Sequence, residues 1–262
     1  MGLEGAGIAT ILARVCSLLG LLYWCRRSSH LKDWVPRRWF RKPDGAAIRE
    51  LVKIAWPASL QVSAETSAFV VAVIMVGSLG AVALAAHQVA ISCAAMVFMV
   101  PLGVSMALTV RIGEAKGAKE FARWRPIVIS GWLICLVISL TSVTVFLLLN
   151  HEIASGFVKE SETIKLAASL LIVAAFFQIG DHSQIVSAGV LRGLDDVKTP
   201  AWIVFCSFWI IGMPLGWLMA FRLQWGAAGI WWGLTIGLSL TAVFLGVRAW
   251  RKTSLPHSSV TE

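Results

Sequence analysis

Residues 166–190 read LAASLLIVAAFFQIGDHSQIVSAGV, a long apolar run in which Asp181 is the single carboxylate. A helix that crosses a bilayer needs about 20 mostly apolar residues. Six further runs of this kind lie at 3–24, 52–76, 87–110, 127–149, 200–221 and 227–249. Their continuity favours helices, because barrel strands alternate in segments of about 10 residues. The sequence therefore predicts an all-α fold, a polytopic transmembrane helix bundle with about seven spans.

The composition agrees with a membrane protein. Apolar residues make up 58% of the chain and charged residues 14%, whereas soluble domains average about 45–50% and about 25%. The balance excludes a disordered chain. The formal charge is +9, but the basic residues fall between apolar runs. We therefore expect the lipid bilayer, and not nucleic acid, as the partner.

Motifs for catalysis and for resident metals are absent from the sequence. It has no GxSxG, HExxH, Walker or GxGxxG pattern, so we expect no enzyme and no cofactor. The cysteines are scattered and odd in number, which indicates neither a disulfide framework nor a zinc site. They are Cys16, Cys25, Cys93, Cys135 and Cys206.

Basic residues cluster in alternate connections between the predicted spans. Segments 26–53, 111–125, 191–199 and 248–252 hold most of the Lys and Arg residues. Since cytoplasmic loops carry an excess of positive charge, we expect a multi-pass inner (plasma) membrane protein with its C-terminus in the cytoplasm. Segment 26–50 also carries Trp34, Trp39 and Phe40 beside Pro36 and Pro43. Both an interfacial segment on anionic lipid and a solvated basic linker fit it.

Two carboxylates stand well inside predicted spans, away from the span ends. An Asp at the bilayer centre costs about 2.5–3.5 kcal/mol on insertion scales, so Glu65 and Asp181 are candidates for a function. Gln61 lies one turn before Glu65, and Pro57, one turn earlier, frees a backbone carbonyl from its helical donor. Gln178 and Gln184 flank Asp181 by three residues on each side.

These residues predict a site that exchanges protons or binds Na⁺ at Glu65 and Asp181, with Gln61, Gln178 and Gln184 in support and Pro57 as a helix distortion. The alternative for either carboxylate is a hydrogen-bond network between packed helices. For His182 and for Arg14, a packing or snorkelling role is favoured.

Several motifs resemble the multidrug and toxic compound extrusion (MATE) transporters, in the NorM-like branch. Pro57 to Phe69 with Gly77-Ser-Leu-Gly80 and Ala85-Ala86-His87-Gln88 is similar to the seventh helix of that family and its entry to the eighth. Three further stretches are similar to other helices of the family. Pro101-Leu-Gly103-Val-Ser-Met-Ala107 is similar to the eighth helix, and Gly2 to Thr10 is similar to the sixth. Asp181-His-Ser-Gln184 with Gly189-Val-Leu-Arg192-Gly193 is similar to the tenth.

The resemblance implies that this chain is the C-terminal half of a protein of twelve helices in two lobes. Residues 1–25 would be the last helix of a missing N-terminal lobe, and 26–50 a basic cytoplasmic linker between the lobes. Residues 51–250 would form the six-helix C-terminal lobe, and 251–262 a cytoplasmic tail. Phe177 departs from relatives that carry a tyrosine there, so a sodium site built as in those relatives does not carry over.

The function that the resemblance implies is cation-coupled (H⁺ or Na⁺) export of drugs or organic cations. The alternatives are a truncated, non-transporting membrane remnant or one lobe of a split transporter. A lipid-linked sugar flippase has less support, because Arg14 is the one Lys or Arg that lies away from the ends of a predicted span.

Overall fold

The computed structural model describes residues 3–28 and 44–254 of the chain. These residues contain no β-strand, and seven of their helical segments are long and apolar enough to cross a membrane. The predicted all-α bundle of about seven spans is therefore confirmed. The chain forms two units, residues 1–49 and 50–262.

The first unit contains α1 (Leu3–Arg27), close to the predicted span 3–24. Ile11, Leu18 and Leu21 are exposed on it, as is Arg14. The helix ends on Arg26 and Arg27. The two alternatives for segment 26–50 rest on residues that lie largely outside the described ranges.

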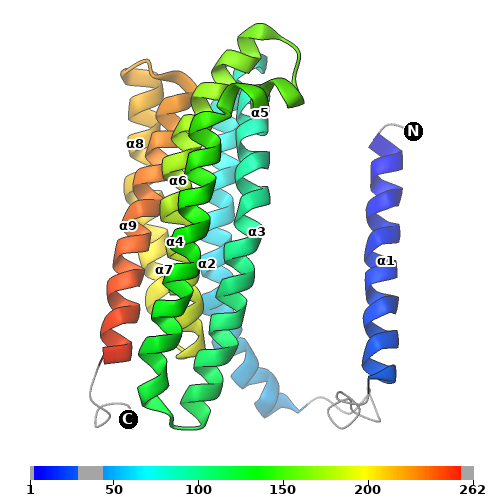
Figure 1. Ribbon diagram of the computed structural model, residues 1–262, viewed down its shortest axis with the longest axis vertical. Coiled ribbons are helices and arrows are strands. Elements are labelled where there is room, and N and C mark those ends of the chain that lie inside the picture. The colour runs from blue at the N-terminus through cyan, green and yellow to red at the C-terminus, as the bar shows by residue number, and fades with distance from the viewer. Residues whose placement is uncertain (1–2, 29–43, 255–262) are drawn as a thin grey trace. The chain divides into compact units, whose positions relative to one another are not determined.

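The second unit is a bundle of long helices that run side by side (Figure 1). A short helix, α5, follows α4 at one end of the bundle and was not predicted from the sequence. The long helices are α2 (Gly45–Gly77), α3 (Ala81–Gly117), α4 (Trp124–Leu148), α6 (Ser161–Gly193) and α9 (Gly226–Ser254), and α5 covers Asn150–Phe157.

The span over Lys198–Arg222 is a composite helix. It consists of α7 (Lys198–Phe205), a π-helical stretch over Cys206–Gly212, α8 (Met213–Trp217) and a second π-helical stretch over Leu218–Arg222. Pro214 lies at the start of α8. Proline has no N–H to donate to the residue four positions earlier, so Pro214 removes one hydrogen bond of the ladder next to the first π-helical stretch.

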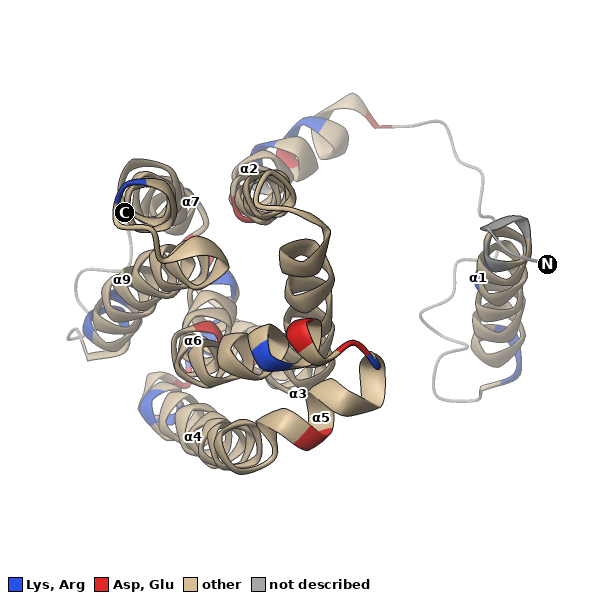
Figure 2. Ribbon diagram, turned by 90° about the horizontal axis from the view of Figure 1, so that it is seen from above, with Lys and Arg blue, Asp and Glu red and all other residues tan. Residues whose placement is uncertain are grey.

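Helix α6 is the centre of the bundle and packs on α3, α4 and α9 (Figure 2). Its contact with α3 depends on close backbone approach. A Cβ on Gly189 would lie 2.4 Å from Ser105 Oγ and 2.5 Å from Ser105 O. Ser105 Oγ donates to Ile185 O at 2.7 Å, and Thr109 Oγ1 donates to Gly189 O at 2.9 Å. Small residues and interhelical hydrogen bonds are the usual means by which membrane helices associate.

Helix α2 packs less closely on the rest of the bundle than α3, α4, α6 and α9 pack on one another. Side chains make much of its connection to the other helices. The Phe69 ring lies 6.0 Å from that of Phe177 and 6.2 Å from that of Phe208, and Trp209 Nε1 donates to Ala64 O at 3.0 Å. Open space is therefore left on two sides of α2.

Ion pairs stabilise the turn between α6 and α7. The turn lies at the end of the bundle where α3 and α9 also end. Asp196 Oδ2 accepts from Arg248 Nε at 2.6 Å and lies 3.1 Å from Lys252 Nζ, both on α9. Lys116 of α3 lies 2.7 Å from Asp195. Burial raises the pKa of Asp196, but the hydrogen bonds and charges of Arg248 and Lys252 outweigh it, so this pKa is below its ordinary value.

Candidate functional site

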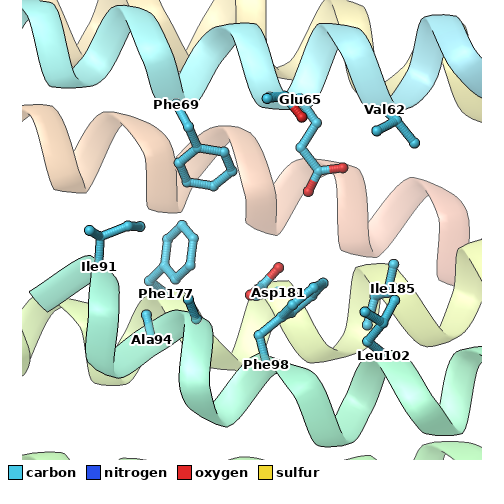
Figure 3. Close-up of a pocket in the computed structure, with 12 residues that line it drawn as sticks. Val62, Glu65, Phe69, Ile91, Ala94, Phe98, Leu102, Phe177, Asp181 and Ile185 are labelled. Atoms are coloured by element: carbon cyan, nitrogen blue, oxygen red, sulfur yellow. The ribbon is translucent and has the colours of Figure 1, made fainter. Parts of the chain in front are cut away.

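A pocket of about 400 Å³ lies between α2, α3 and α6 (Figure 3). Its walls are apolar side chains, apart from two carboxylates and one hydroxyl. Helical spacing explains why these residues share the pocket, since positions three and four apart lie on one helix face. The lining consists of Val62, Glu65, Thr66 and Phe69 from α2, Ile91, Ala94, Ala95, Phe98 and Leu102 from α3, and Phe177, Asp181 and Ile185 from α6.

Glu65 and Asp181 point toward one another across this pocket (Figure 3). They come from different helices, and their charges interact. Asp181 is 6% exposed and Glu65 is half-buried. The structure thus brings together the two carboxylates that the sequence singles out, in an apolar cavity within the predicted membrane region.

Gln184 joins this pair from α6. Its side chain interacts with Glu65, while its Oε1 is buried and has no hydrogen-bond partner. Gln178 is fully buried, and neither its Oε1 nor its Nε2 has a partner. Buried polar groups are nearly always satisfied by protein, water or an ion. Neither Gln178 nor Gln184 is among the residues that line the carboxylate pocket.

Aromatic rings form the wall of the pocket on one side of the carboxylates. Phe177, one turn before Asp181, meets Phe69 at an interplanar angle of 74°. It also meets Trp231 of α9, with ring centroids 5.5 Å apart at 70°. Trp231 Nε1 in turn donates to His87 Nδ1 at 3.1 Å. Phe177 therefore supplies an aromatic ring, and no oxygen atom, one turn before Asp181.

Other residues named from the sequence lie elsewhere. Gln61 is buried on α2 but does not line the pocket, and Pro57 borders a different groove. His182 is fully buried, and its Nδ1 lies 2.8 Å from Ser139 Oγ on α4. Arg14 belongs to α1 in the other unit.

Sequence reasoning missed Thr66 and Phe98 as pocket residues. Thr66, the residue after Glu65, adds a hydroxyl to the lining. Phe98 of α3 adds an aromatic ring beside Asp181 (Figure 3). For Thr66 a signal was available, because it lies four residues after Val62 and three before Phe69 on the stripe of Glu65. For Phe98 the sequence contains no such signal, because the periodicity of α3 does not indicate which of its faces contacts α6.

The chain is similar to known proteins in sequence and in fold. A protein named "Probable multidrug resistance protein NorM" from Agrobacterium fabrum is 36% identical over 253 residues, which are 95% of this chain and 54% of that protein. A protein of the same name from Xylella fastidiosa is 37% identical over 250 residues, covering 94% and 53%. The chain thus spans about half the length of the curated relatives it matches.

Solved structures share the fold. The eukaryotic MATE transporter AtDTX14 superposes with a TM-score of 0.80 at 21% identity, over 91% of this chain and 55% of that one. A MATE structure in the straight conformation gives 0.82 at 18% identity, over 95% and 56%. The MatE family model matches residues 57–218, more than half of the chain. The resemblance seen in the sequence is thereby confirmed, and the chain belongs to the MATE family.

Proposed function

We propose that the chain supplies one lobe of a cation-coupled antiporter that exports drugs or organic cations, with Glu65 and Asp181 as the coupling groups. The observation that carries the proposal is the pair of carboxylates facing each other in an apolar pocket inside a membrane bundle. Ionisable residues at such positions commonly mark ion pathways. The NorM name of the relatives supports drug export as the activity.

Electrostatics links the pair to cations. Two negative charges in a low-dielectric pocket repel one another strongly, and water screens them little. A proton, a sodium ion or an organic cation relieves this repulsion. Because all three neutralise the same two carboxylates, occupancy by one opposes occupancy by another. Competition of this kind is what exchange transport requires.

The packing of α2 links cation occupancy to the conformation of the helix bundle. Glu65 lies on α2 and Asp181 on α6, while α2 is the less closely packed of the two helices. Repulsion between the carboxylates favours separation of α2 from α6, and a bound cation favours their approach. A ligand shifts a conformational equilibrium by its difference in affinity for the two states, and here the cation makes different contacts in each.

The pocket walls suit an apolar organic cation. Phe69, Phe98 and Phe177 offer aromatic surface next to the negative charges, and aromatic faces attract cations. The volume of about 400 Å³ lies in the range of about 300–1,000 Å³ for drug-sized ligands. The lining contains no Lys or Arg, so it offers little to the pyrophosphate of a lipid-linked sugar.

Coupling by H⁺ or Na⁺ differs in the oxygen ligands it needs. In the pocket lining, Glu65, Asp181 and the hydroxyl of Thr66 are the side-chain oxygens available for sodium, and a proton needs only the carboxylates. For orientation, we propose that the end of the bundle with the α3–α4 turn and the end of α9 faces the cytoplasm. That end carries Lys116, Arg248 and Lys252, as expected of a cytoplasmic side.

Ligand binding to the purified chain in lipid nanodiscs tests the proposal. Ethidium, an aromatic cation, is titrated by fluorescence, with acidification and added Na⁺ as competitors. We expect both to weaken binding, and Glu65→Gln or Asp181→Asn to weaken it about tenfold, a loss of about 1.4 kcal/mol.

Glu162→Gln is the matched control, since Glu162 lies in the first turn of α6 and does not line the pocket. Circular dichroism verifies that each variant keeps its helices. Variants at Glu65 and Asp181 that bind ethidium with wild-type affinity and wild-type pH dependence would refute the assignment.

A further inference from the structure

A second groove, of about 730 Å³, lies between α2 and the composite helix. On α2 it is lined by Trp56, Pro57, Leu60, Ser63, Ala64 and Ser67. These positions lie about 160° around the helix from the stripe of Glu65, at about 100° per residue. The groove is thus separated from the carboxylate pocket by the body of α2, and its occupant is a separate question.

The length of the groove corresponds to one leaflet of a bilayer. It runs from Trp56 to Ser67 along α2 and from Lys198 to Trp209 along the composite helix. At about 1.5 Å per residue, each wall is about 16 Å long. The hydrocarbon core of a bilayer is about 30 Å thick. The groove therefore has the reach of a single acyl chain.

Cationic side chains gather at the mouth of the groove and are not neutralised. Lys198 lines the groove, and Lys53 lies one turn before Trp56 and Pro57 on the same face of α2. Neither lysine forms an ion pair within the described part of the chain. By contrast, Lys116, Arg248 and Lys252 at the same end of the bundle are paired with aspartates.

Aromatic and apolar side chains complete the groove. Trp56 is 64% exposed and Trp202 is 69% exposed beside the mouth, where indole rings suit the headgroup level of a membrane. Leu60 and Phe205 form the walls below them. Toward the other end, the Trp209 indole donates to Ala64 O and bridges the two helices. The groove thus has a charged mouth and an apolar body.

We propose that this groove binds one anionic phospholipid, with its phosphate at Lys198 and Lys53 and one acyl chain between α2 and α7. The charge of the mouth selects the headgroup, since basic sites between membrane helices bind anionic lipids. The site does not depend on the proposed transport activity.

Native mass spectrometry of the purified chain tests the site. Phosphatidylglycerol and phosphatidylethanolamine with the same acyl chains are supplied in equal amounts after delipidation. We expect the first to bind preferentially, and the preference to fall about fivefold for each of Lys198→Gln and Lys53→Gln, as about 1 kcal/mol per lysine implies. Lys119→Gln is the matched control, because Lys119 lies in the α3–α4 turn away from the groove.

A second variant tests the groove itself without changing charge. Ser63→Leu places apolar bulk in it from an exposed position, and we expect it to lower the binding of both lipids. A wild-type chain with no preference between the lipids would overturn the proposal and leave the groove to a transported compound or a protein segment. An equal loss in Lys119→Gln would also overturn it, as would undiminished lipid binding by Ser63→Leu.

Discussion

Phe69 of α2 meets Phe177 of α6 edge to face, with ring centroids 6.0 Å apart, on the wall that also carries Glu65 and Asp181. The contact couples the less closely packed helix to the centre of the bundle. It also places an aromatic ring, and no oxygen, one turn before Asp181.

Phe177→Tyr adds an oxygen ligand at this position. We expect Na⁺ to compete more strongly with ethidium in this variant than in the wild type, while competition by protons changes little. Ethidium titrations with and without NaCl at constant pH measure the effect. Phe176→Tyr is the control, because Phe176 stacks on Trp232 of α9 and does not line the pocket. An unchanged sodium effect in Phe177→Tyr would show that position 177 has no part in ion selection.

Gly189→Ala should destabilise the bundle. The added Cβ would lie 2.4 Å and 2.5 Å from atoms of Ser105, which forces α3 away from α6 and costs about 1–3 kcal/mol. Gly103→Ala on α3 meets nothing within 4 Å and should be neutral or slightly stabilising, since Ala favours helix over Gly by up to about 1 kcal/mol. Thermal unfolding in detergent compares the two, and equal melting temperatures would contradict the described α3–α6 contact.

Asp196→Asn should lower stability in a pH-dependent way. The pKa of Asp196 is lower in the folded protein than its ordinary value of 3.8, so the carboxylate stabilises the fold fully above that value and loses this effect as pH falls below it. We expect the wild type to exceed Asp196→Asn by about 1–3 kcal/mol at neutral pH. The difference should stay constant down to about pH 4 and shrink below it.

Asp195→Asn serves as the control for Asp196. The side chain of Asp195 is 70% exposed, and an exposed ion pair contributes about 0–1 kcal/mol. Melting curves between pH 7 and pH 3 compare both variants with the wild type. A stability gap at Asp196 that grows on acidification would contradict the ion-pair assignment.

Gln184→Leu should weaken the binding of cations, because it removes the amide that contacts Glu65. Gln61→Leu makes the same change at a buried position whose side chain is not among those that interact with Glu65, and we expect near-wild-type affinity. Ethidium titrations separate the two. A larger effect at Gln61 than at Gln184 would reverse this assignment of their roles.

Much of the fold follows from the sequence, because runs of apolar residues long enough to cross a bilayer admit few structures other than helices. The break of the span at 200–221 into α and π segments was not predicted, although Pro214 marks its position. Helix α5 (Asn150–Phe157) was missed because its eight residues are too few to show a clear apolar period.

The site was predicted in part, for a definite reason. Glu65 and Asp181 stand out because ionisable residues are rare inside membrane spans. This rarity can be recognised from the sequence alone. Gln61 and Gln184 look equivalent in the sequence, each close to a carboxylate. Only packing between helices distant in the chain brings Gln184 to Glu65, and periodicity within one helix carries no information on its neighbours.

The most direct test of the account is the number of protons released when ethidium binds the chain in weakly buffered, sodium-free nanodiscs. If Glu65 and Asp181 hold the cation that the drug displaces, binding should release protons in the wild type and none in the Glu65→Gln/Asp181→Asn double variant at saturating ethidium. The same proton release from the double variant, or no release from the wild type at any pH between 6 and 8, would contradict the account.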